Sequence, residues 1–359
     1  MNLAERWAAF VARGGAASVA PPCASDDLPE GWARCAGVLA RERSFPVQPP
    51  DGYWAERLAG VDLGPLEGWR FLDLETSGLR GRPFLAGIGR FAGDAVLVRL
   101  LALQEPANEP EWLEAPRREL DGATALVTFN GRSFDVPLLC DRYALTGDRA
   151  SAALLRSLPH WDLCGLARRA WGGGRLSELQ ARLLDRGRHD DVPGWMIPGL
   201  YTAFLQGDGG SLGLAAEHNA ADVAALAGIA SFATRQLASG CGCGGLALAA
   251  GAHLRAAVAY EREGRRHLAA RLFKRAGMWD EAERLWRGLL PSAEAAVELA
   301  KLYEHRRKRP ELALEVVNLA LARSRLSPRW RADLERRRQR LCRAAPIGPR
   351  RNARAPTDP

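Results

Sequence analysis

Short apolar runs bounded by turn residues dominate the chain between residues 69 and 163. The sequences that separate the first three runs, Gly-Arg-Pro and Ala-Gly-Asp, are short enough to close hairpins. Runs of this length with turn residues at both ends are typical of β-strands. We therefore predict five strands, at residues 69–75, 84–91, 95–103, 125–130 and 160–163.

The other apolar residues of this region recur at helical spacing. They predict helices at residues 109–120, 133–144, 176–184 and 211–237. Ser133 is the expected N-cap of the second helix, and Ser177 with Gln180 three residues later is expected to form a capping box in the third. Strands that first meander and then alternate with helices imply a mixed sheet. The expected fold over residues 67–238 is therefore an α/β domain with a mixed five-stranded sheet flanked by helices.

Other patterns apply on either side of this domain. Residues 1–66 are rich in proline and glycine after a short amphipathic start, so we expect an irregular lead-in with one candidate strand at residues 38–45. Residues 239–245, Ser-Gly-Cys-Gly-Cys-Gly-Gly, have the composition of a flexible linker. Residues 246–345 are helical in pattern, and two similar segments within them predict an all-α helical-repeat domain of the tetratricopeptide type, with a plain helical bundle as the alternative. The proline- and arginine-rich residues 346–359 are expected to be a disordered basic tail.

Composition places the chain among ordinary globular proteins, with 359 residues and a hydrophobic fraction of 47%. No window of eighteen residues is both apolar and uncharged, and the first residues lead into no signal-peptide core. We therefore expect no membrane span and a cytoplasmic location. Seven cysteines without metal-finger spacing argue against a disulfide framework.

Charge is divided unevenly along the chain. Residues 1–245 carry 24 Lys and Arg against 29 Asp and Glu, whereas residues 246–359 carry 26 against 13. The net charges of the two parts are therefore −5 and +13. A basic part of this size favours a polyanionic partner, of which nucleic acid is the commonest, and a solvated arginine-rich surface is the alternative.

Asp73 and Glu75 alternate with apolar residues at the end of the first predicted strand, so both carboxylates point to the same face. The turn sequence Thr-Ser-Gly that follows places them at the carboxyl end of the strand, where open sheets bind ligands. Two carboxylates in one small space repel each other unless a cation lies between them, and such oxygen ligands suit Mg²⁺ or Mn²⁺. The alternative is an exposed strand end with two solvated acids.

Three further acids follow the same sheet. Asp135 falls in the first turn of the helix after the fourth strand, a position that the helix dipole also favours. His218 and Asp222, four residues apart, share one face of the last helix of the domain. Asp162 ends the fifth strand and is expected to be a helix cap.

Together these stretches resemble the DEDD exonucleases of the DnaQ-like, RNase-H-fold superfamily. The shared features are Asp-x-Glu on a first strand, Asn-x4-Asp after a fourth strand, and a late helical acid with a histidine four residues before it. The sequence Asp-Val-Pro-Gly-Trp-Met-Ile-Pro at residues 191–198 and the stretch 218–226 look like the YprB-type RNase-H-like exonuclease family. The resemblance covers about residues 69–237, and this family often carries tetratricopeptide-like sequence after its nuclease domain.

The resemblance implies a two-metal-ion 3′–5′ exonuclease that hydrolyses phosphodiester bonds of single-stranded nucleic acid, either DNA or RNA. Asp73, Glu75, Asp135 and Asp222 would hold two ions, Mg²⁺ or Mn²⁺, and His218 would be the general base. Only three residues separate His218 from Asp222, which is the spacing of the subgroup with a tyrosine in this position. The alternative function is a catalytically inactive RNase-H-like nucleic-acid-binding or scaffold protein, whose helical repeats bind a protein partner.

Overall fold

The computed structural model describes residues 31–35, 38–78, 81–187, 192–323 and 325–344. Contacts divide the chain into two compact units, one ending at Gly242 and the other beginning at Cys243, except that Ala249–Gly251 pack with the first unit. The first unit contains the sheet, and the second is helical. The predicted tail and the amphipathic start lie outside the described residues.

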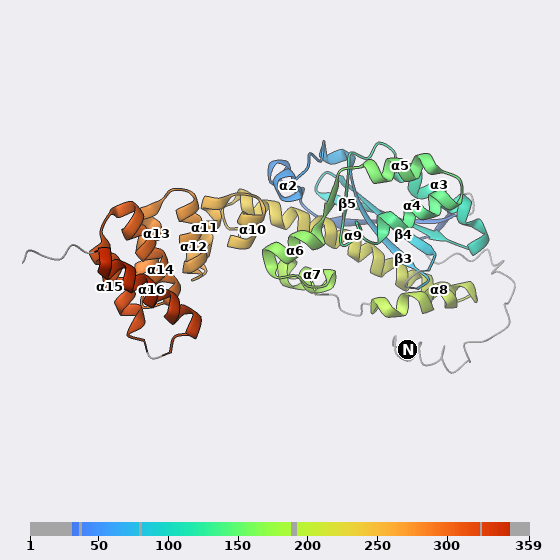
Figure 1. Cartoon of the computed structure of the whole chain (residues 1–359). Helices are drawn as coiled ribbons and strands as arrows, with labels where there is room; N and C mark the ends of the chain where they lie inside the picture. The colour runs from blue at the N-terminus through green and yellow to red at the C-terminus, as the bar shows by residue number, and fades with distance from the viewer. Residues whose placement is uncertain (1–30, 36–37, 79–80, 188–191, 324, 345–359) are drawn as a thin grey trace, which may run out of the picture. The chain divides into compact units, whose positions relative to one another are not determined.

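A seven-stranded mixed sheet forms the centre of the first unit (Figure 1). Its strands are β1 (Ala33–Cys35), β2 (Val38–Pro46), β3 (Trp69–Thr76), β4 (Pro83–Ala92), β5 (Ala95–Leu103), β6 (Ala125–Thr128) and β7 (His160–Asp162). The spatial order is β1-β2-β5-β4-β3-β6-β7. β6 runs parallel to β3 and β7 parallel to β6, whereas the other neighbours are antiparallel. The predicted mixed sheet is confirmed, but the prediction of five strands is wrong because two more extend the sheet beyond β5.

The two additional strands come from the predicted lead-in. β2 pairs with β5 along its whole length, from Val38 opposite Leu103 to Pro46 opposite Ala95. The candidate strand at residues 38–45 is therefore confirmed as β2. The expectation of an otherwise irregular segment is wrong, because the described part of residues 31–66 also contains β1 and helix α2 (Gly52–Ala59). The strand is stabilised by hydrogen bonds to a partner distant in sequence, and its proline- and glycine-rich surroundings do not reveal that pairing.

Helix α9 (Gly209–Ala238) crosses one face of the sheet, while α3 (Glu109–Glu119), α4 (Asp135–Leu145) and α5 (Arg149–Ser157) cover the other (Figure 1). Sixteen residues of α9 are buried, on nearly all sides, because α7 (Leu176–Leu184) and α8 (Ile197–Leu205) also pack against it. A helix that is apolar nearly all round is expected in such a central position.

Two glycines of β4 let α9 lie close to the sheet. A Cβ atom at Gly87 would lie 2.0 Å from Asn219 Oδ1, and one at Gly89 would lie 2.7 Å from Val223 Cγ1. Either methyl group would push the helix away, so these positions need glycine for close approach. The distance between α9 and β4 therefore depends on the absence of two side chains.

Two of the three predicted helix caps differ from the structure. α4 begins after Phe134, so Ser133 is not its N-cap, although Asp135 does lie in the first turn. In α7 the backbone N–H of Arg175 donates to Glu178 Oε2 (2.9 Å), so the capping interaction lies two residues before the predicted one. Asp162 is a cap, as predicted: its Oδ1 accepts from the N–H of Cys164 at the start of α6 (Leu163–Trp171).

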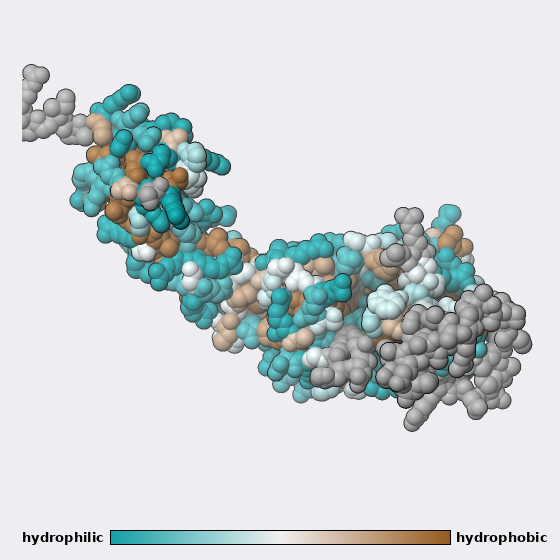
Figure 2. Space-filling view, turned by 90° about the horizontal axis from the view of Figure 1, so that it is seen from below, coloured by the Kyte–Doolittle hydropathy of each residue, from teal (hydrophilic) through white to brown (hydrophobic). Residues whose placement is uncertain are grey.

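The second unit consists of helices in which consecutive members pack against each other. After α10 (Gly244–Ala249) they are α11 (His253–Arg262), α12 (Arg266–Arg275), α13 (Trp279–Arg287), α14 (Ala293–Lys301), the π-helical turn η4 (Leu302–Arg307), α15 (Pro310–Leu321) and α16 (Pro328–Ala344). Buried alanines at the contacts between these helices allow close packing. On the face of this unit that Figure 2 shows, hydrophilic residues cover much of the surface. The all-α prediction is confirmed, and the tetratricopeptide assignment stays a prediction. Among the described residues, no helix combines the length and apolarity that a bilayer crossing needs.

Candidate metal centre

Strand β3 presents Asp73 and Glu75 toward α9. Leu72 and Leu74 are buried on the other face of the strand, while the two acids are half-buried. Asp73 lies opposite Gly87 of β4. Because the side chains of both acids meet residues of α9, they share one face of the sheet, as their alternation in the sequence predicts.

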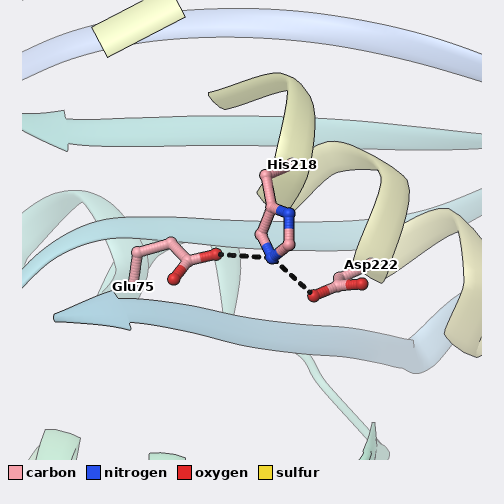
Figure 3. A group of neighbouring side chains, drawn as sticks. All are labelled: Glu75, His218 and Asp222. Atoms are coloured by element: carbon pink, nitrogen blue, oxygen red, sulfur yellow. Dashed lines mark ion pairs between the residues drawn. The ribbon is translucent and has the colours of Figure 1, made fainter. Parts of the chain in front are cut away.

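Helix α9 supplies the facing side chains, His218 and Asp222, from consecutive turns. His218 Nε2 lies 3.9 Å from Glu75 Oε1 and 3.4 Å from Asp222 Oδ2 (Figure 3). One ligand atom from each of the three residues lies within 4.8 Å of the others. Their side chains are only 13–16% exposed, so the group is largely shielded from water.

Asp135, the first residue of α4, contacts the same strand β3. Its Oδ1 accepts the backbone N–H of Leu74 at 3.1 Å, and the side chain is buried. Its negative charge raises the pKa of Glu75, and that of Asp222 raises the pKa of Asp135. The structure thus gathers all five predicted residues around the end of β3. Glu75, His218 and Asp222 form the compact group, and Asp73 and Asp135 lie beside it without belonging to that group of three.

Two of these carboxyls resist ionisation. Burial, together with the charges of Asp222 and Asp135, raises the pKa of Glu75 to about 8, although His218 and Asn219 act in the opposite direction. Burial likewise raises the pKa of Asp135 to about 7, against the lowering effect of backbone hydrogen bonds. Burial and neighbouring acids disfavour the ionised form of each carboxyl, and a bound cation would offset both effects.

Asn219 is the polar residue of the site that the sequence did not reveal. It is fully buried, and its Nδ2 donates to Asp73 Oδ2 at 2.7 Å and to the backbone oxygen of Asp73 at 3.2 Å. Its Oδ1 is buried and accepts no hydrogen bond from the described residues. Two glycines in one strand, at positions 87 and 89, are the sequence signal that could have indicated a close helix contact here.

The donor set fits divalent cations. Four carboxylates offer hard oxygen ligands, and the imidazole of His218 lies between two of them. Mg²⁺ and Mn²⁺ prefer such oxygens. The raised pKa values of Glu75 and Asp135 show that their ionised forms are unfavourable without a positive charge nearby. A bound cation would stabilise these ionised forms.

The part of the chain that forms this site is similar to known proteins. The model of the RNase_H superfamily matches residues 70–234, from β3 into α9. The first unit contains an RNase-H-like domain. All five predicted site residues lie within the match. The protein YprB of Bacillus subtilis (strain 168), described as uncharacterized, is 29% identical over 287 residues, which cover 70% of this chain and 68% of that protein.

These comparisons confirm the resemblance to the RNase-H superfamily and to YprB. An RNase-H-like domain points to nuclease activity on nucleic acid, and nucleases of this fold typically use divalent metal ions.

Proposed function

We propose that the protein is a two-metal-ion 3′–5′ exonuclease that hydrolyses phosphodiester bonds of single-stranded nucleic acid. The observation that carries this proposal is the grouping of Glu75, His218 and Asp222, with Asp73 and Asp135 beside them, at the end of one strand of an RNase-H-like sheet. The 3′–5′ direction and the preference for single strands rest on the resemblance of the motifs to DEDD exonucleases.

Asp73, Glu75, Asp135 and Asp222 would hold two Mg²⁺ or Mn²⁺ ions. When bound, such ions stabilise the negative charge that develops on the phosphate and lower the pKa of water. Within the protein, Asn219 fixes Asp73 by donating a hydrogen bond to its Oδ2. The hydrogen bond from Leu74 fixes Asp135 in the same way.

In this proposal His218 accepts a proton from the attacking water. Its Nε2 lies 3.4 Å from Asp222 Oδ2, and the negative charge of that acid would stabilise the imidazolium ion that proton uptake creates. The position on α9, four residues before Asp222, holds the ring on the same helical face as that acid. The low exposure of the ring limits competing contact with bulk water.

Hydrolysis of end-labelled single strands tests the proposal. Full-length protein with Mg²⁺ or Mn²⁺ should shorten a 5′-labelled oligonucleotide progressively from its 3′ end and release nucleoside 5′-monophosphates. EDTA should stop the reaction, and a circular single strand should resist it. DNA and RNA substrates of one sequence, assayed in parallel, decide the preferred sugar.

Substitutions separate the site from contaminating nuclease. Asp73→Asn and Asp222→Asn each remove a ligand and should abolish hydrolysis while the circular dichroism spectrum stays unchanged. Asp94→Asn, an exposed acid on the β4–β5 turn, is the matched control and should retain full activity. Undiminished, metal-dependent cleavage by either site variant would refute the proposal, and binding without any cleavage by the wild type would favour the inactive, nucleic-acid-binding alternative.

A further inference from the structure

Helix α16 carries the densest positive charge of the second unit. Its 17 residues contain seven arginines and two acids. By contrast, residues 253–321 contain 14 Lys and Arg against 10 Asp and Glu. With a net charge of +5 in 17 residues, α16 has a higher density of positive charge than residues 253–321, whose net charge is +4.

The arginines of α16 are not equivalent. Leu334 and Leu341 are buried, and the helix packs on α15 and α14. Arg329, Arg336 and Arg343 recur every seven residues on the opposite side and are exposed. At 1.5 Å per residue they lie about 10.5 Å apart along the helix. We call these three residues the arginine stripe.

Two other arginines of α16 have a structural role. Arg337 and Arg340 both pair with Glu304, which is only 8% exposed, and thereby tie α16 to η4. Glu304 compensates part of their charge.

The stripe itself is weakly compensated. Arg336 lies 3.4 Å from Asp333, but Arg336 is 72% exposed, and such exposed pairs contribute little. Within the described part of the chain, Arg329 and Arg343 form no ion pair with an acid. The stripe therefore presents a line of three guanidinium groups to solvent.

We propose that the arginine stripe binds the phosphate backbone of single-stranded nucleic acid. This inference rests on the proposed function, because it assigns a binding surface for the same substrate. Guanidinium groups bind phosphate oxygens in bidentate fashion. Protein interfaces and membrane-surface helices use apolar anchors. Here the positions beside the stripe are Ala332, Asp333, Gln339 and Arg340, none of which is a large apolar residue. Leu334 and Leu341 are buried, and Trp330, which is 38% exposed, lies about 100° around the helix from Arg329 and so outside the stripe. A backbone of repeated negative charges therefore fits the stripe best.

Binding measured without metal isolates the stripe from catalysis. Full-length protein in EDTA is titrated against a fluorescently labelled 30-nucleotide single strand, and anisotropy is followed from 50 to 300 mM salt. The test variant carries Arg329→Gln, Arg336→Gln and Arg343→Gln. A control variant of equal charge loss carries Arg266→Gln, Arg275→Gln and Lys308→Gln, three exposed residues outside α16.

Loss of three phosphate contacts should reduce the slope of log K against log salt by about 2 and lower affinity about a hundredfold at 0.1 M salt. The control variant should bind within a few-fold of the wild type. Equal binding by the stripe variant and the wild type overturns the inference, as does an equal loss in both variants, which would mean that only net charge matters. Retained stripe-dependent binding in a wild type that never cleaves would refute the proposed function and leave this inference intact. An acidic polypeptide that outcompetes the oligonucleotide at the stripe would also overturn it.

Discussion

Divalent-metal binding at the end of β3 should strengthen steeply as pH rises. Glu75 and Asp135 must be ionised to bind a cation, and burial raises their pKa values to about 8 and about 7. Below pH 7 both carboxyls hold protons that a metal ion has to displace. The apparent affinity for metal should therefore be low in acid and should level off above pH 8.

The magnitude follows from these two pKa values. At pH 6, the need to remove the bound proton weakens the apparent affinity for metal by about a hundredfold at Glu75 and about tenfold at Asp135. At pH 8 the two factors are only about 2 and about 1. Between pH 6 and pH 8 the affinity should therefore rise roughly 500-fold, or about 4 kcal/mol. Glu75→Gln removes the larger factor and should leave a rise of only about tenfold.

Calorimetric titration with Mn²⁺ at pH 6, 7 and 8 measures this dependence. Repeating each titration in two buffers of different ionisation enthalpy counts the protons released, which should approach two per protein at pH 6 and fall below one at pH 8. Asp94→Asn should behave as the wild type. A wild-type affinity that does not change between pH 6 and pH 8 would refute the reasoning, and so would a Glu75→Gln variant that keeps the full rise.

Three other measurements test the same site. Folding raises the pKa values of Glu75 and Asp135 from 4.5 and 3.8 to about 8 and about 7, so metal-free protein should become less stable as pH rises from about 4 to 8, by on the order of 8 kcal/mol. Thermal unfolding in EDTA should show this loss, and Glu75→Gln should reduce it. His218→Ala should lower turnover about a hundredfold and remove the acidic limb of the pH–rate profile, whereas His218→Tyr should keep partial activity; an unchanged profile in His218→Ala would assign the ring to structure. Asn219→Ala should weaken Mn²⁺ binding at least tenfold, because Asp73 loses the hydrogen bond that fixes it. Gly87→Ala should have the same effect, because its Cβ would displace Asn219. Unchanged affinity in both variants would exclude a role of Asn219 in positioning Asp73.

The acids of the site were predictable because each follows from a local pattern. The alternation of Asp73 and Glu75 with leucines fixes their common face, and the spacing of His218 and Asp222 fixes theirs. The position of Asn219 in the site depends instead on the close contact between α9 and Gly87 of β4. These two segments are far apart in the sequence, so neither of them alone predicts the contact. The same reason explains why residues 38–45 could be predicted as a strand but not placed in the sheet, since the partner strand β5 lies 49 to 65 residues away. The sequence was also insufficient for the caps, because neither Ser133 nor Ser177 lies at the N-cap of its helix.

The centre is divided between two elements that are far apart in the chain. Asp73 and Asn219, which hydrogen bond to each other, are separated by 146 residues, and the intervening chain folds into most of the sheet and its helices. During synthesis, β3 and α4 leave the ribosome long before α9 does. A nascent chain thus carries three of the acids without their partner helix, so docking of α9 completes the centre. Any nuclease activity should therefore begin only at that late step.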